Sequence, residues 1–180
     1  MCAIKQIFAI IGSASSGSSN EILVNHLARL ANDKLSFTIF NQLKSLPHFD
    51  PGLSINNPPA EIIAFRQQVE QADGILICTP EYVFSIPSGL KNAIEWCIST
   101  TVFSGKPCGL ITASANGQKG HEELQLIMKT AMAVFNADTT LLIGGIKGKV
   151  NEEGKVADKP TLDALTRFSN AFIALVCQEA

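Results

Sequence analysis

Hydrophobic residues along this chain form short continuous runs that alternate with longer stretches of helical spacing. The short runs are rich in Ile, Leu, Val and Phe, which is typical of strands buried on both faces. Five strands are therefore expected, at residues 5–11, 35–40, 75–78, 108–113 and 139–143. Apolar residues three and four positions apart predict the helices. These are expected at residues 21–31, 60–71, 88–99, 122–135 and 160–177.

The alternation of strands and helices predicts a parallel sheet with helices on both faces. Right-handed crossovers make such a sheet doubly wound, and ligands then bind beyond the carboxyl ends of its strands. Three loops of unusual sequence fall at those ends, at residues 12–20, 79–88 and 113–120. We expect them to form one site. No internal repeat or domain boundary is visible, so residues 1–180 are expected to form a single domain.

Two further segments fall outside this alternation. Residues 41–59 are rich in Pro, Asn and Gly, and they are expected to cover a ligand or form an interface rather than serve as a linker. Residues 148–156 predict a surface turn or a small hairpin.

Composition narrows the classes of function. The chain has 46% hydrophobic and 17% charged residues, a net charge of −2 and no Lys/Arg run, so neither nucleic acid nor a membrane is an expected partner. Its apolar runs are far shorter than the roughly 20 residues that span a bilayer. The apolar residues 7–11 fit a first buried strand better than a signal peptide. We expect a cytoplasmic protein.

The cysteines and histidines lack the spacing of a metal site. We expect reduced and mostly buried thiols, with metal ligation and catalysis as the less favoured alternatives. The cysteines in question are Cys2, Cys78, Cys97, Cys108 and Cys177.

The first loop, GSASSGSSN at residues 12–20, carries five hydroxyls and two glycines directly before a helix. Backbone N–H groups, hydroxyls and a helix N-terminus together favour phosphate binding. The loop matches neither GxGxxG nor the P-loop pattern, which disfavours a dinucleotide-binding Rossmann site or an NTPase. The alternative is an ordinary strand–helix turn in which Ser18 or Ser19 caps the helix.

This loop, together with PEYVFSIPSGLKNAIEW at residues 80–96, resembles the NADPH-dependent FMN reductase family of flavodoxin-like quinone, chromate and azo-dye reductases. The family pattern is roughly GSxRxxSxN after the first strand and PEYNxSxPxxLKNAIDW after the third. The likeness extends to residue 143 and to the last helix. It implies a flavodoxin-like three-layer α/β sandwich with strand order 2-1-3-4-5. FMN is the implied cofactor, with NADPH or NADH as substrate.

The resemblance also implies the residues of the site. Ser13, Ser18 and Asn20 would hold the FMN phosphate, with Ser15 and Ser19 beside them. The flavin ring would be bordered by residues of two further loops, which are Pro80, Glu81, Tyr82, Val83, Phe84, Ser114 and Gly117. No catalytic side chain and no metal are expected, because the flavin carries the chemistry. In the helix after the second motif, Lys91 and Asn92 would help to fix the flavin loop.

The sequence departs from the family pattern at several positions. Ser15 stands where the family has Arg, which removes a bidentate phosphate partner and leaves the choice between NADPH and NADH open. Val83 replaces the family's Asn, and Lys129 an Arg. His121 is expected to be a solvated histidine at a helix start rather than a contact of the nicotinamide phosphates. Trp96 is expected in the core or in an interface.

The implied function is an FMN-dependent NAD(P)H oxidoreductase that passes electrons to quinones or similar small acceptors by a ping-pong mechanism. A homodimer or homotetramer is implied, with the neighbouring subunit contacting residues 41–59 or the third helix. One alternative is a flavodoxin-type electron carrier without NAD(P)H turnover, although the near-neutral charge argues against it. The other is a degenerate family member that no longer binds flavin.

Overall fold

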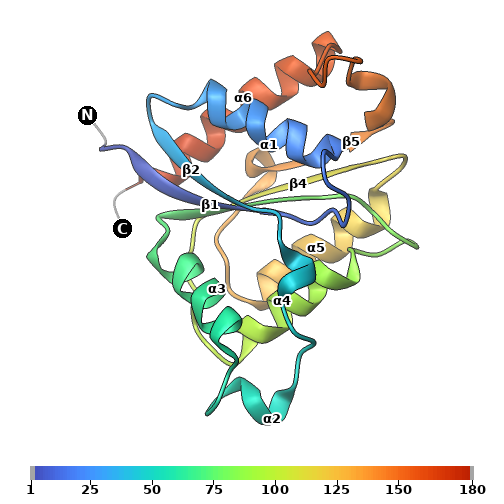
Figure 1. The fold of residues 1–180 in the computed structure, drawn as a ribbon. Coiled ribbons are helices and arrows are strands. Elements are labelled where there is room, and N and C mark those ends of the chain that lie inside the picture. Colours follow the sequence, from blue (N-terminus) through green and yellow to red (C-terminus); the bar gives the residue numbers. More distant parts are fainter. Residues whose placement is uncertain (1–2, 179–180) are drawn as a thin grey trace.

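The computed structural model describes residues 3–178, in which a five-stranded parallel sheet lies between two layers of helices (Figure 1). The sheet order is β2-β1-β3-β4-β5, and every neighbouring pair is parallel. The predicted fold and strand order are confirmed. The strands are β1 (Lys5–Ile11), β2 (Leu35–Phe40), β3 (Gly74–Thr79), β4 (Cys108–Ser114) and β5 (Thr140–Gly144).

The helices divide between the two faces of the sheet. α1 (Ser19–Leu30) and α6 (Lys159–Val176) cover one face, and α3 (Ala60–Gln71), α4 (Ser88–Ile98) and α5 (Gln118–Thr130) cover the other (Figure 1). Each face has its own apolar core, with Leu27 and Phe172 in one and Phe65 and Trp96 in the other. Trp96 is fully buried within its own chain, so it belongs to the core rather than to an interface.

The central strand explains the continuous apolar runs. All six residues of β3 are buried. Because side chains alternate across a strand, Leu76 packs into the core beneath α1 and α6, whereas Ile77 packs into the opposite core. A strand covered on both faces has no polar side, so its sequence shows no alternation.

Helix α5 lies four or five residues earlier than the expected range of 122–135. It begins at Gln118 because Gly117, with φ +94°, turns the chain into the helix directly after β4. It ends at Thr130, after which Met132 adopts φ +63° and the chain runs back beside β4. There the Val134 carbonyl accepts a hydrogen bond from Cys108 N at 2.8 Å.

The 41–59 segment contains two short helices, η1 (Leu43–Ser45) and α2 (Pro51–Ser54). Side chains of α4 hold it against the domain. Asn92 accepts from Phe49 N at 2.7 Å and donates to Pro47 O at 2.9 Å, while Trp96 Nε1 donates to Pro47 O at 2.8 Å. The segment is therefore anchored to α4.

The remaining elements are η2 (Ala137–Thr139) and η3 (Ile146–Lys149). Val150 and Val156 form an antiparallel bridge, in agreement with the small hairpin expected there. Cys78, Cys97 and Cys108 are buried free thiols. Cys177 is partly exposed, whereas Cys2 lies outside the described residues. Across residues 3–178, no helix is both long and apolar enough to cross a bilayer.

Candidate functional site

A cavity of about 730 Å³ opens at the carboxyl ends of β1, β3 and β4, where the three unusual loops were expected to meet. A second cavity, of about 420 Å³, adjoins it, and Ser13 and Tyr82 line both. The expected site residues that line the larger cavity are Ser13, Ser15, Ser18, Ser19, Asn20, Pro80, Tyr82 and Ser114. The others, Glu81, Val83, Phe84 and Gly117, lie in the adjoining loops without lining it.

The first loop presents backbone donors to the larger cavity. Ser18 caps α1 by accepting a hydrogen bond from Glu21 N at 3.2 Å, so the capping alternative is also correct. Within residues 3–178, the N–H groups of Ser16, Ser18, Ser19 and Asn20 have no hydrogen-bond partner. Free N–H groups at the start of a 12-residue helix form a site for an anion such as a phosphate. The loop therefore fits the phosphate of FMN.

Glu21, in the first turn of α1, is a polar residue next to this loop that the sequence reasoning missed. Its carboxylate accepts from Gly17 N at 2.9 Å and from Asn41 Nδ2 at 3.4 Å. The spacing of Ser18 and Glu21 is that of a capping box, which was the available signal. Lys147 also lines the larger cavity, and it is an exposed cation with no ion pair inside the described range.

Asn20 turns its side chain inward, below the loop. Only 3% of the residue is exposed; its Nδ2 donates to Ala113 O at 3.4 Å, and its Oδ1 accepts from Cys78 Sγ at 3.4 Å. The amide thus joins α1 to the ends of β3 and β4. Only its backbone N–H remains free to face the cavity.

The loop after β3 closes in a tight two-residue turn. Tyr82 N donates to Ser85 O at 2.9 Å and Ser85 N donates to Tyr82 O at 3.0 Å. Val83 and Phe84 occupy the turn with φ +51° and +59°, the left-handed conformation of a type I′ turn. Both side chains project outward, with 94% of Val83 and 74% of Phe84 exposed.

The Glu81 side chain points away from the cavity and toward α5. Its Oε2 accepts from Gly120 N at 2.8 Å and its Oε1 from Gly117 N at 3.3 Å. Gly117 has no side chain with which to cap α5, and the carboxylate supplies the missing acceptor where the helix dipole favours a negative charge. Glu81 thereby ties the loop after β3 to the loop after β4.

A second carboxylate side chain, that of Glu123, extends from α5 toward the turn. Glu123 Oε2 accepts from Ser85 Oγ at 2.6 Å and from Ile86 N at 3.0 Å. Lys91 was expected to help fix this loop. Its Nζ lies 3.8 Å from Oε1 of Glu123, the residue that binds the loop. Nothing in the sequence marked Glu123, because it lies 38 positions from Ser85.

His121 is not the solvated histidine that was expected. Only 8% of it is exposed, and its Nδ1 lies 3.0 Å from Thr112 Oγ1 on β4. The earlier start of α5 places His121 one turn inside the helix, on the side that faces the sheet. Burial lowers the pKa of its imidazole, and the nearby Glu122 opposes that shift.

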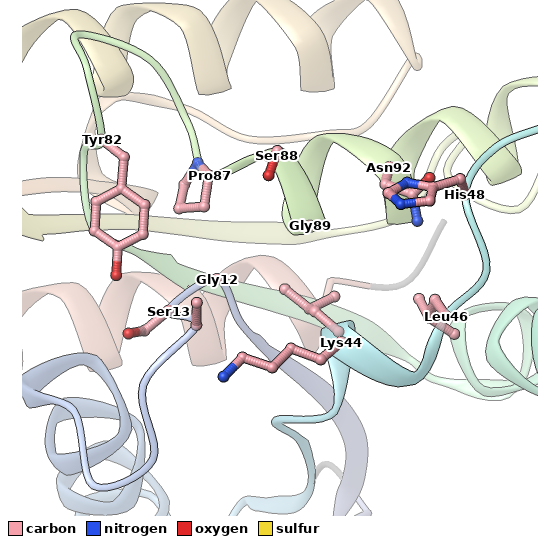
Figure 2. Close-up of a pocket in the computed structure, with 12 residues that line it drawn as sticks. Gly12, Ser13, Lys44, Leu46, His48, Tyr82, Pro87, Ser88, Gly89 and Asn92 are labelled. Atoms are coloured by element: carbon pink, nitrogen blue, oxygen red, sulfur yellow. The ribbon is translucent and has the colours of Figure 1, made fainter.

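The smaller cavity lies on the other side of Ser13 and Tyr82, beneath the start of α4 (Figure 2). Its polar side chains include Lys44, His48 and Asn92, and no carboxylate of residues 3–178 lines it. The Lys44 side chain extends along the cavity toward the Gly12–Ser13 turn (Figure 2), and the described residues give it no ion pair. The cavity therefore carries net positive charge and fits an anionic group.

Comparison with known proteins agrees with this geometry. A sequence profile for NADPH-dependent FMN reductase matches residues 6–145. A quinone reductase of Escherichia coli (strain K12) is 33% identical over 175 residues, 93% of each chain. A 2-hydroxy-1,4-benzoquinone reductase of Burkholderia sp is 30% identical over 178 residues, 95% of this chain and 96% of the relative. In fold, the chain is similar to a flavoenzyme NAD(P)H:(acceptor) oxidoreductase from Paracoccus denitrificans, with a TM-score of 0.76 at 23% identity over 96% of this chain and 97% of that one.

Proposed function

Because the chain belongs to the NADPH-dependent FMN reductase family, we propose that it is an NAD(P)H-dependent oxidoreductase that uses FMN to reduce quinones or similar small acceptors. The larger cavity is the observation that carries the proposal. It connects a loop with free backbone N–H groups to a loop that carries Tyr82, and both lie at the ligand-binding edge of the sheet. A phosphate at one end and a flat ring at the other match the two halves of FMN.

In this proposal the N–H groups of Ser16, Ser18 and Ser19 bind the FMN phosphate, with the Ser13 and Ser15 hydroxyls beside them. At the other end, Pro80 and Tyr82 border the flavin ring, and Ser114, whose Oγ donates to Glu81 O at 3.4 Å, lies beside them. The hydrogen bond from Gly117 N to Glu81 Oε1 joins the two loops that carry these residues. Held by these residues, FMN would supply the redox chemistry that links the nicotinamide donor to the acceptor.

We further propose that donor and acceptor use one open site in turn, which is a ping-pong mechanism. The smaller cavity adjoins the proposed ring position through Tyr82, and its Lys44 is placed to receive a phosphate of the nicotinamide nucleotide. The quinone reductases among the relatives support a quinone as the acceptor.

The proposal includes a homodimer or homotetramer. Val83 and Phe84 expose large apolar surfaces beside the cavity, and a second copy of the chain would bury them. A cytoplasmic location is also proposed, because Cys78, Cys97 and Cys108 remain free thiols in the core.

Steady-state oxidation of NADPH and NADH by the FMN-loaded protein, with and without a quinone, tests the function. We expect quinone-dependent turnover whose double-reciprocal plots give parallel lines. Bound FMN without turnover would favour the electron carrier. Failure to take up FMN would favour the degenerate family member.

A further inference from the structure

Two glutamate side chains connect the loop at residues 79–88 with α5, one extending from each side. Glu81 leaves the loop and accepts from Gly117 N and Gly120 N on the α5 side. Glu123 leaves α5 and accepts from Ser85 Oγ and Ile86 N on the loop side. The turn at residues 82–85 is thus fixed by charge-assisted hydrogen bonds at both of its ends.

This turn has a backbone conformation that its own residues disfavour. Type I′ turns place both central residues at positive φ and favour Asn followed by Gly, whereas here Val83 and Phe84 occupy these positions at +51° and +59°. A β-branched residue at positive φ is an outlier that costs on the order of 1–3 kcal/mol. Such a conformation persists only where the surrounding structure holds it in place.

We propose that Glu81 and Glu123 are positioning residues that hold the 82–85 turn in its left-handed shape, and that this shape is required to receive the flavin ring. The inference rests on the proposed function, because it assumes that the turn borders the flavin. Within the turn, the N–H groups of Val83 and Phe84 have no partner among residues 3–178. They are the backbone donors that a rigid turn can direct at the polar edge of the ring.

The packing around the two carboxylates supports this role. A Cβ atom added at Gly120 would lie 3.2 Å from Glu81 Cβ and 3.3 Å from Ser85 O. A side chain at position 120 would therefore crowd the loop, which lies close against the start of α5. Lys91 on α4 lies 3.8 Å from Glu123 Oε1, so a third element helps to hold that carboxylate in place.

Amide hydrogen exchange tests the restraint without any flavin. In Glu81→Ala and Glu123→Ala proteins, the Tyr82 and Ser85 amides that close the turn should exchange at least tenfold faster than in the unmodified chain. Glu122→Ala is the matched control, because Glu122 is adjacent to Glu123 but pairs with Lys119 on the exposed side of α5. Unchanged exchange in both variants would overturn the proposal, even if their thermal stability fell.

Titration with FMN tests the role in cofactor binding. We expect FMN affinity to fall at least fivefold in Glu81→Ala and Glu123→Ala, with an altered flavin absorption band, and to fall less in Glu123→Gln, which keeps an acceptor oxygen. The decisive comparison uses Val83→Asn/Phe84→Gly, a pair that favours the type I′ turn by itself. In that background, Glu123→Ala should change FMN affinity less than twofold.

An undiminished loss of affinity in the Asn-Gly background would overturn the proposal, because the glutamate would then act on something other than the strained turn. The outcome is separate from that of the proposed function. A protein without quinone-dependent NAD(P)H oxidation would refute the function, whereas the exchange rates and FMN affinities would still decide the role of the two carboxylates.

Discussion

The Nδ1 atom of His121 lies 3.0 Å from the hydroxyl oxygen of Thr112, and both residues are buried where α5 packs against β4. A neutral imidazole can share one hydrogen with this hydroxyl, whereas a protonated one would bring a charge into the same apolar contact. Burial accordingly lowers the pKa of His121, and burial together with the Arg29 charge lowers that of His26 on α1.

These two histidines predict that the free energy of unfolding falls as the pH drops. In the unfolded chain each titrates near its ordinary value of about 6.5, whereas in the folded protein each takes up its proton only at lower pH. The unfolded state therefore binds more protons below about pH 6.5, and stability decreases until the folded-state pKa is passed. Urea unfolding between pH 7.5 and 5.5 measures this slope.

His121→Gln should reduce that slope, because glutamine keeps a hydrogen-bonding group near Thr112 but does not titrate. The combined His26→Gln/His121→Gln protein should reduce it further. A slope that is identical in all three proteins would contradict the assignment.

The buried side chain of Asn20 is expected to stabilise the fold through its hydrogen bonds. Asn20→Ala removes the amide that contacts Ala113 O and Cys78 Sγ, leaving a buried carbonyl without its partner. We expect a loss of about 1–3 kcal/mol in the free energy of unfolding. Asn25 lies in the same helix and is only partly buried, and its side chain makes no hydrogen bond among residues 3–178, so Asn25→Ala should change the free energy of unfolding by less than about 0.5 kcal/mol. Equal effects of the two substitutions in chemical denaturation would refute the buried role of Asn20.

The fold could be predicted because the hydrophobic patterns that define its strands and helices are local in the sequence. Apolar runs such as residues 75–78 and 108–113 are typical of strands buried on both faces, and their alternation with helices predicts a parallel sheet. The edges of α5 were misplaced because Gly117 and Met132 turn the chain at positive φ, which the hydrophobic pattern does not encode. His121 was misjudged as a consequence.

Only part of the candidate site could be predicted from the sequence. Ser13, Ser18 and Tyr82 could be placed from loops that follow strands, since the carboxyl ends of parallel strands meet at one edge. The direction of the Glu81 side chain and the contribution of Glu123 depend on contacts between residues 36 to 39 positions apart. Neither spacing nor residue type predicts such contacts.

The buried thiols predict slow alkylation. Burial raises the pKa of Cys97 and of Cys108 to about 12 and raises that of Cys78 as well, so the reactive thiolate is scarce at neutral pH. In the folded protein, iodoacetamide should modify these three cysteines at least a hundredfold more slowly than Cys177, which is partly exposed. Peptide mass spectrometry after timed labelling measures the four rates. Rapid native labelling of Cys78 would contradict its burial beneath Asn20.

Ser15 predicts a gain of affinity. The residue is exposed and lines the larger cavity, so Ser15→Arg can place a guanidinium beside the free N–H groups of the first loop. One charge-assisted contact with the FMN phosphate should tighten binding about tenfold, and the gain should shrink at high salt. Ser15→Gln, similar in length but neutral, should leave the affinity within twofold. An unchanged affinity in Ser15→Arg, measured by flavin fluorescence, would place the phosphate elsewhere.

Lys44 predicts a selective effect on the electron donor. The smaller cavity contains this cation and no carboxylate from the described part of the chain, and it adjoins the proposed ring position through Tyr82. Lys44→Ala should therefore raise the KM for NADPH about tenfold, the equivalent of one lost contact between a charge and a phosphate, while FMN affinity stays within twofold. Lys147→Ala is the matched comparison, because Lys147 lines the larger cavity and should affect FMN affinity instead. If Lys44→Ala left the KM for both NADPH and NADH unchanged, the nucleotide phosphates would not bind in the smaller cavity.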